Sequence, residues 1–344
     1  MQARQTHIDA LKCIGSQLIV LHHFTAYGPL ADALHRLAPA LAGWFYDYAR
    51  MAVQIFLVLG GYLALHSLES LASRSGTELL RGIGRRYLRL VLPFLAALLL
   101  ALASAALARA WLEADFLPAA PAAAQLLAHA LLLHSVLDVE ALSAGIWYVA
   151  IDFQLYTLLA LLLWLGVRSG LARLAVLLLL PASLFHFNRD AGWDAWSLYF
   201  FGSYGLGVVA AWAARSPQPL RWLLPLSALV LLALWQDWRT RIALALGVAL
   251  LLALQPWRGW HGRALPPGVQ RALHALGRSS YALFLVHFPV LMLANALYAR
   301  LGLHGPLAGV LVLLLGWAAS MLLAAWFERR VETPLARLRS FRPD

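Results

Sequence analysis

Ionisable side chains inside the first apolar stretch, 8–28, are the residues in this sequence best placed to do chemistry. The stretch is long enough to cross a bilayer, for which about 20 residues suffice, yet it contains Asp9, Lys12 and His23. Lys12 and His23 are eleven positions apart, about three helical turns, so both fall on one face roughly 16 Å apart. His22 is turned away by roughly 100°. Because charged groups inside a span are costly and usually functional, the pattern predicts a cation and a proton-exchanging imidazole on one face.

A purely structural role explains the same residues in another way. Lys12 would extend its ammonium group to the membrane surface, with Asp9 as a partner three residues away in the helix. His23 would then be a histidine whose hydrogen bonds are satisfied between packed helices. We favour the functional interpretation because a second apolar stretch carries a carboxylate, which supplies a further member of such a site.

That carboxylate is Asp152, which lies well inside the apolar stretch 144–167. Tyr148 and Tyr156 are one turn to either side of it on the same helical face, and Gln154 is close by. A membrane-buried carboxylate requires a cation, a histidine or a proton. The candidate partners are Lys12, His23 and a group of arginines before the third apolar stretch.

These arginines are Arg81, Arg85 and Arg89, spaced four residues apart, with Arg86 beside them. If the segment is helical, the first three form one stripe. Such a stripe at the membrane surface suits a polyphosphate, because guanidinium groups bind phosphate oxygens in pairs. The alternative is a topological signal that contacts anionic lipid.

Two further polar residues, Ser280 and His287, lie seven positions apart on one face of the apolar stretch 274–299. Pro289 is expected to kink this helix. We interpret Ser280 and His287 as candidates for substrate binding, while a structural role explains His287 equally well.

The elements that position these residues follow from composition. The 344-residue chain is 62% hydrophobic and only 12% charged, whereas soluble domains average about 25% charged residues. It is therefore expected to be all-α, a polytopic membrane helical bundle forming one domain over 1–344, rather than a soluble α/β enzyme. Segment 121–136 is apolar but short and is expected to be interfacial or re-entrant. The ten expected spans are 8–28, 50–67, 88–112, 144–167, 171–187, 195–214, 219–235, 239–254, 274–299 and 305–328.

The arginines indicate the orientation of these spans. Nineteen fall on the side of the N-terminus and seven on the other side, which predicts that both termini are cytoplasmic. The net charge of +11 therefore reflects short loops at a membrane, and we expect no nucleic-acid partner. The single cysteine, Cys13, excludes an internal disulfide and a cysteine-based metal cluster, so no metal is expected. The seven arginines on the far side are Arg36, Arg50, Arg109, Arg189, Arg239, Arg241 and Arg300.

Five stretches in this order resemble the acyltransferase-3 family of integral membrane acyltransferases. The first-span motif of that family, an Asp, then Arg or Lys, ten residues and a His, is similar to IDALKCIGSQLIVLHHF, with Asp9, Lys12 and His23. The other four stretches are AVQIFLVLGGYLA, RGIGRRYLRLVLP, IWYVAIDFQLY and SYALFLVHFPVL. The resemblance covers nearly the whole chain.

The chain departs from the family pattern at several positions. Lys12 stands where Arg is commoner, Gln54 where many members have Asp, and Gly60 where they have Ser. Asp152 replaces the usual Glu, and Phe284 replaces a Tyr. The carboxylate at position 152 is kept, but it is one methylene shorter.

The resemblance implies transfer of an acyl group from cytoplasmic acetyl-CoA, or another acyl-CoA, to a hydroxyl of a glycan or lipid-linked glycan. It also implies a multi-pass protein of the bacterial cytoplasmic (inner) membrane. In this interpretation His23 acts as a general base or transient acyl carrier, and Asp152 orients its imidazole. The residues expected to bind CoA phosphates or polarise the thioester are Lys12, Arg81, Arg85, Arg86 and Arg89. The residues expected to contact substrate are Tyr148, Tyr156, Gln154, Ser280 and His287.

A proton-coupled transporter or flippase for a lipid or organic acid is the competing hypothesis. The same buried Lys, His and Asp would then form a proton relay. Transporters often contain duplicated halves with interrupted helices, and this sequence has no such internal symmetry, which favours the acyltransferase.

Overall fold

The computed structural model describes residues 6–169, 171–254 and 265–337, and within these ranges every regular element is helical. The predicted all-α class is therefore confirmed. The arginines at positions 4, 258, 263, 339 and 342, counted above for orientation, lie outside the described residues.

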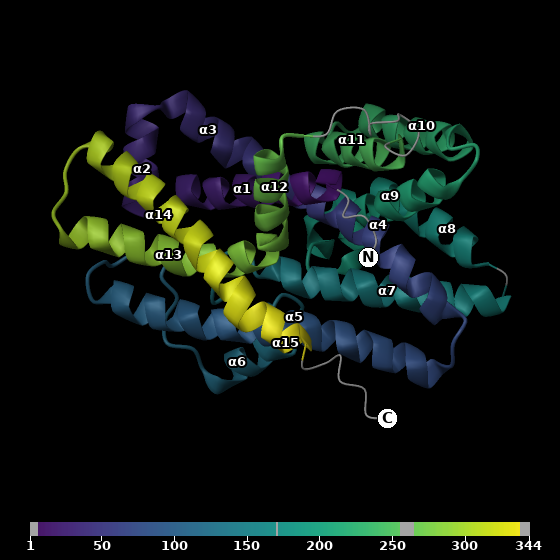
Figure 1. Cartoon of the computed structure of the whole chain (residues 1–344), viewed down its shortest axis with the longest axis horizontal. Helices are drawn as coiled ribbons and strands as arrows, with labels where there is room; N and C mark the ends of the chain where they lie inside the picture. The colour runs from purple at the N-terminus through teal and green to yellow at the C-terminus, as the bar shows by residue number, and fades with distance from the viewer. Residues whose placement is uncertain (1–5, 170, 255–264, 338–344) are drawn as a thin grey trace. The chain divides into compact units, whose positions relative to one another are not determined.

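Contacts divide the chain into two compact units, each of which is described by itself (Figure 1). Unit 1 comprises Met1–Ala52, Arg89–Trp147 and Pro267–Asp344. Unit 2 comprises Val53–Leu88 and Tyr148–Pro266. Helix α5 (Gly76–Arg109) supplies its first part to unit 2 and its second part to unit 1.

Unit 1 is built around α1, which packs on α12, α13, α2 and α3. Figure 1 shows α13 and α14 running beside each other, and these two helices also pack on α2. A π-helical turn, Glu328–Glu332, follows α14 and leads into α15 (Thr333–Arg337). The remaining helices of unit 1 are α1 (Thr6–Ala26), α2 (Gly28–Leu37), α3 (Pro39–Tyr48), α6 (Ala123–Ala130), α12 (Pro267–Arg278), α13 (Ser280–Arg300) and α14 (Pro306–Phe327).

Unit 2 is organised around α9, which is buried along almost its whole length and contacts α4, α8, α10 and α11. At the crossing of α4 and α9, a Cβ at Gly61 would collide with the Tyr204 carbonyl, and one at Gly207 with the Val58 carbonyl. The backbones of α4 and α9 are therefore in direct contact at this crossing, a close approach that glycine permits. The helices of unit 2 are α4 (Val53–Ala72), α7 (Trp147–Ser169), α8 (Ala172–Phe185), α9 (Ser197–Arg215), α10 (Leu220–Gln236) and α11 (Thr240–Leu254).

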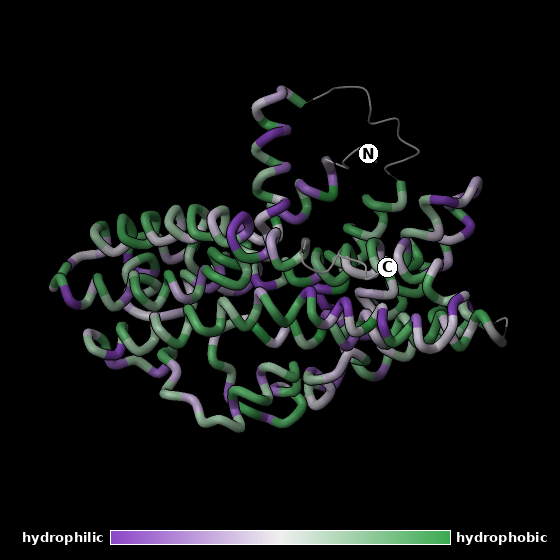
Figure 2. The backbone as a smooth tube through the Cα atoms, turned by 60° about the horizontal axis from the view of Figure 1, so that its bottom comes forward, coloured by the Kyte–Doolittle hydropathy of each residue, from purple (hydrophilic) through white to green (hydrophobic). Residues whose placement is uncertain are grey.

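Six helical segments in the described part of the chain are long and apolar enough to cross a membrane. Figure 2 shows hydrophobic residues along most of the helical path of both units. Each of the ten predicted stretches contains a helix, but α8, α10 and α11 have only 14, 17 and 15 residues. The polar residues of α1 lower its hydropathy, so it is not among the six. Ten spans and cytoplasmic termini therefore stay predictions. The six segments are Pro39–Ala72, Gly76–Arg109, Trp147–Val167, Ser197–Arg215, Ser280–Arg300 and Pro306–Ala336.

Three boundaries differ from the expected ones in ways that matter for the site. α5 begins at Gly76, so the arginine stripe is helical. The expected span 274–299 is divided between α12 and α13, at Ser279. In segment 121–136 only α6 is helical, and turns follow it.

Candidate active site

A pair of buried histidines from α1 and α13 forms the centre of unit 1. His23 Nδ1 lies 2.7 Å from His287 Nε2, and the two rings are nearly parallel, at 4°. His287 is fully buried, and His23 keeps 8% of its surface exposed. The two residues are 264 positions apart in sequence, so only the packing of α13 on α1 brings them together.

Hydrogen bonding determines which nitrogens of the pair carry protons. His287 Nδ1 lies 3.0 Å from the carbonyl oxygen of Leu283, which only accepts, so Nδ1 is the donor. In the neutral ring the other nitrogen, Nε2, then accepts, and His23 Nδ1 must donate to it. His23 therefore keeps its lone pair on Nε2, which is the atom a general base uses.

Gly145 brings backbone against the edge of the His23 ring. Its φ is +79°, a conformation that costs side-chain-bearing residues energy. A Cβ at this position would lie 3.2 Å from His23 Cε1 and 3.3 Å from the Phe284 ring. The segment before α7 therefore packs its backbone closely against the imidazole, and the absence of a side chain at Gly145 makes this approach possible.

Another histidine holds that segment in place from α6. His129 Nδ1 donates to the Gln125 carbonyl at 2.8 Å, and its Nε2 accepts the Leu142 N–H at 3.2 Å. The Gln125 side chain also donates to the Glu140 carbonyl at 3.0 Å. These side-chain bonds replace secondary structure and attach the segment 140–145 to α6.

His134 stacks on His129, with ring centroids 4.4 Å apart. Both of its nitrogens are buried, and neither has a hydrogen-bond partner among the described residues. Burial, followed by the charge of His129, lowers the pKa of His134 to about 4, and burial also lowers the pKa of His129. Both rings are therefore neutral near pH 7.

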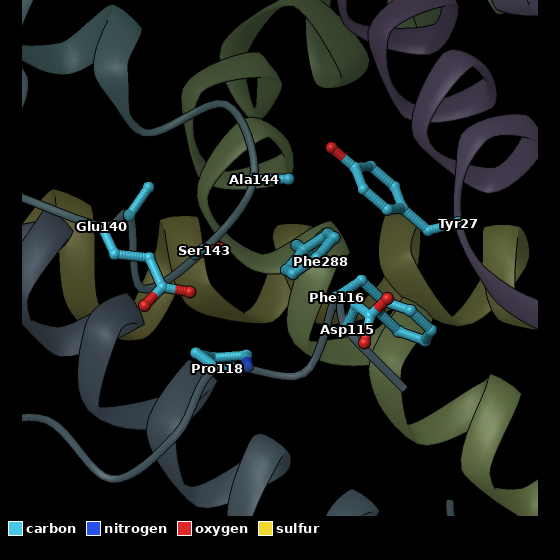
Figure 3. A pocket seen from close by; sticks show the side chains of 9 residues that line it. Tyr27, Asp115, Phe116, Pro118, Glu140, Ser143, Ala144 and Phe288 are labelled. Carbon is cyan, nitrogen blue, oxygen red and sulfur yellow. The ribbon is translucent and has the colours of Figure 1, made fainter. Parts of the chain in front are cut away.

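A cavity of about 180 Å³ is lined in part by two rings that contact His23, those of Tyr27 and Phe288 (Figure 3). Figure 3 shows the rings of Tyr27, Phe116 and Phe288 at one side and the Glu140 carboxylate at the other. The Tyr27 and Phe288 rings also contact His23, with centroids 5.9 Å and 6.4 Å from its ring. The cavity is lined by Tyr27, Asp115, Phe116, Pro118, Glu140, Ala141, Ser143, Ala144 and Phe288.

At the start of α1, Asp9 is buried and its Oδ2 lies 2.5 Å from His274 Nδ1 of α12. The sequence indicated Lys12 as a partner of Asp9, and the structure adds a contact with His274. On the same unit, Arg278 Nε pairs with Glu328 Oε1 at 3.2 Å.

Lys12 belongs to a group of charges that the π-helical turn completes. The charges of Lys12 and Arg89 both act on the carboxylate of Glu332, one oxygen of which is buried without a hydrogen-bond partner among the described residues. Lys12 is half-buried and Arg89 is exposed. Two cations and two carboxylates, those of Glu328 and Glu332, therefore meet at this end of unit 1.

In unit 2 the buried carboxylate has a different partner from the histidine considered above. Asp152 Oδ2 forms an ion pair with Arg86 at 2.5 Å, and the Arg86 guanidinium lies 5.1 Å from the centre of the Tyr156 ring. Arg81 and Arg85 remain exposed on α5. Of the candidate partners of Asp152, the arginine group supplies a contact within unit 2. The role of Asp152 in orienting the His23 imidazole stays a prediction.

Three residues expected to bind substrate are engaged in structural hydrogen bonds. Gln154 donates to the Ala195 carbonyl at 3.2 Å and accepts the Ser197 N–H at 2.9 Å, which fixes the start of α9. Ser280 donates to the Gly277 carbonyl at 3.0 Å, at the end of α12. His287 is fully buried and reaches the site only through His23. Tyr148 packs edge-on against Phe56.

The structure adds residues that the sequence did not indicate. The cavity residues Asp115, Phe116 and Glu140 lie in irregular segments between α5 and α7, and the supporting His129 lies in the short helix α6 between them. Helical periodicity carries no information there, since the contacts are made by turns. The described residues contain no group of three or more His, Cys, Asp or Glu arranged to hold a metal ion.

A family model described as "Acyltransferase domain" matches residues 6–329 of 344, so the match runs through both units. No curated protein matches the chain, and no solved structure does.

Proposed function

From the premise that the chain belongs to the acyltransferase-3 family and is a membrane acyltransferase, we propose that it transfers an acyl group from acyl-CoA to a hydroxyl. The donor is acetyl-CoA or another acyl-CoA reached from the cytoplasmic side of a bacterial inner membrane, and the acceptor is a glycan or lipid-linked glycan. The observation that carries this proposal is the hydrogen-bonded series from Leu283 through His287 to His23. It leaves His23 Nε2 unprotonated, and two rings that contact His23, those of Tyr27 and Phe288, also line an open cavity.

The reaction needs a base because a hydroxyl is a poor nucleophile near neutral pH. His23 Nε2 takes the proton from the acceptor hydroxyl as its oxygen attacks the thioester carbonyl. The carbon–sulfur bond then breaks, and the CoA thiolate leaves with the proton that His23 returns. His287 stabilises the charged imidazole because its Nε2 accepts the hydrogen bond from His23 Nδ1.

The donor is bound, in this proposal, by the cationic residues. Lys12 and Arg89 act on a common carboxylate, Glu332, and Arg85 and Arg81 continue the arginine stripe along α5. CoA phosphates would compete with Glu332 for the two cations, since charge-assisted bonds to phosphate are strong. Arg86 is already paired with Asp152, so in this proposal it has a structural role on α5 and does not bind the donor.

The decisive test uses purified protein in detergent with radiolabelled acetyl-CoA. We expect His23→Ala to lose about 100-fold or more of CoA release and transfer, within the usual range for removal of a general base. His22→Ala is the matched control, because His22 is the neighbouring residue and bonds instead to the Phe45 carbonyl. Full activity in His23→Ala would refute the mechanism. Failure of every acyl-CoA to bind would refute the donor and favour transport.

A further inference from the structure

We propose that the cavity beside Tyr27 binds one sugar ring of the acceptor and selects neutral or amino sugars over acidic ones. This inference rests on the proposed function, and it concerns which acceptor reaches His23. It follows from the size of the cavity, its aromatic lining and its two carboxylates.

The size of the cavity suits one six-membered ring. Its volume is about 180 Å³, and an interior cavity of about 150 Å³ suffices to bind benzene. Sites for drug-sized ligands are larger, about 300–1,000 Å³, so a whole CoA molecule does not fit. The cavity therefore accommodates a unit of the acceptor and not the donor.

Three aromatic rings give the cavity a face for a sugar. Tyr27, Phe116 and Phe288 contact one another, with centroid distances of 5.4 Å, 6.0 Å and 6.5 Å. The faces of aromatic rings are electron-rich and attract the weakly positive C–H groups of a pyranose. The three rings therefore offer an apolar face on which a sugar ring can stack.

Two carboxylates supply the selectivity. Asp115 and Glu140 line the cavity and are exposed, so they are available to accept hydrogen bonds from sugar hydroxyls or from an ammonium group. The same charges repel an acidic sugar, and they also repel the phosphates of the donor. Ser143 places a buried hydroxyl at the same cavity.

The rings that line the cavity also contact the base. Tyr27 follows His23 by four residues, and Phe288 follows His287 directly. Both rings touch His23, at 5.9 Å and 6.4 Å between centroids. A sugar on these rings therefore lies one ring away from the imidazole that takes its proton.

The test measures binding of three probes to the full chain in detergent by saturation-transfer NMR. The probes are methyl β-glucopyranoside, methyl β-glucosaminide and methyl β-glucuronide. We expect the glucuronide to bind about tenfold more weakly than the other two, a difference of about 1.4 kcal/mol. In the double variant Asp115→Asn, Glu140→Gln this difference should disappear, because both substitutions keep shape and remove charge.

Glu113→Gln is the matched control, since Glu113 is an exposed carboxylate two residues from Asp115 and does not line the cavity. This substitution should leave the order of the three probe affinities unchanged. Absence of binding by all three probes, or an order that the double variant does not alter, overturns the cavity proposal. Acetyl-CoA turnover is followed in the same preparations. Turnover without probe binding refutes the cavity alone, whereas selective probe binding without any use of acyl-CoA refutes the proposed function.

Discussion

Two polar pairs in the interior of the molecule, His23–His287 in unit 1 and Arg86–Asp152 in unit 2, differ in whether they leave a hydrogen-bonding atom free. The ion pair is closed, because Arg86 and Asp152 satisfy each other's charge beside Tyr156. The histidine pair is open at one end, because its proton order leaves His23 Nε2 as an acceptor. Burial of a titratable group is thus weak evidence for catalysis until the direction of its hydrogen bonds is known.

The largest effect should come from breaking the closed pair. Asp152→Ala leaves the half-buried Arg86 guanidinium without its counter-charge, which we expect to cost about 3 kcal/mol of folding stability, the lower end of the range for a fully buried pair. The double variant Arg86→Met, Asp152→Leu should recover most of that loss. Denaturation in detergent measures both. A stable Asp152→Ala protein that has lost only activity would show that Asp152 is catalytic after all.

The open pair should respond in activity rather than stability. We expect His287→Leu to lower kcat about 100-fold with little change in acceptor KM, in line with removal of a supporting hydrogen-bond partner. His287→Gln retains an oxygen that accepts from His23 Nδ1, so it should recover part of the loss. The pH–rate profile should shift in His287→Leu, and equal rates for the two variants would contradict the positioning role.

A substitution beside the open pair should have a smaller effect. Gly145→Ala adds a Cβ at a φ of +79° and within 3.2 Å of His23 Cε1. We expect a loss of about 1–2 kcal/mol in stability from the strained backbone and a lower kcat from the displaced ring. Gly268→Ala is the control, since a Cβ there meets nothing within 4 Å. Unchanged activity in Gly145→Ala would show that the ring tolerates the contact.

The smallest effect concerns another pair, His129–His134, whose rings are nearly parallel like those of His23 and His287 but have no hydrogen bond between them. The pKa of His134 is about 4 in the folded state and about 6.5 in an unfolded chain, so the unfolded state binds more protons. Stability is therefore complete above pH 6.5 and falls as the pH decreases toward 4, by about 1 kcal/mol at pH 5.5.

His134→Phe should flatten that dependence in thermal denaturation between pH 7 and pH 4.5. The exposed His304 provides the matched control as His304→Gln. If His134→Phe and the parent chain lose stability equally, another group dominates the acid response.

Much of this organisation was predictable from the sequence because it depends on helical periodicity. The all-α class, the shared face of Lys12 and His23 and the stripe of Arg81, Arg85 and Arg89 all follow from spacing along one helix. Spacing also showed that His22 faces away, toward the Phe45 carbonyl.

The partners of these residues were not predictable, because they come from elements far apart in the chain. Nothing in the sequence separates His287 from Asp152 as the partner of His23, since the choice depends on which helix packs on α1. Gln154 was predicted to bind substrate because it is polar within an apolar helix. In the structure its side-chain oxygen instead accepts a hydrogen bond from the Ser197 N–H, which has no partner within α9. The acidic cavity residues Asp115 and Glu140 lie in irregular segments, where the sequence has no helical period to interpret.

The bond from the Leu142 N–H to His129 has a practical consequence for following this protein in solution. Most slowly exchanging amides in a helical protein report on helices, but this one reports on a single imidazole. Its hydrogen–deuterium exchange rate should rise when His129 is protonated or when the stretch 140–145 leaves α6, while the helical amides stay protected. One backbone proton thus provides a direct measure of whether the wall of the cavity is in place.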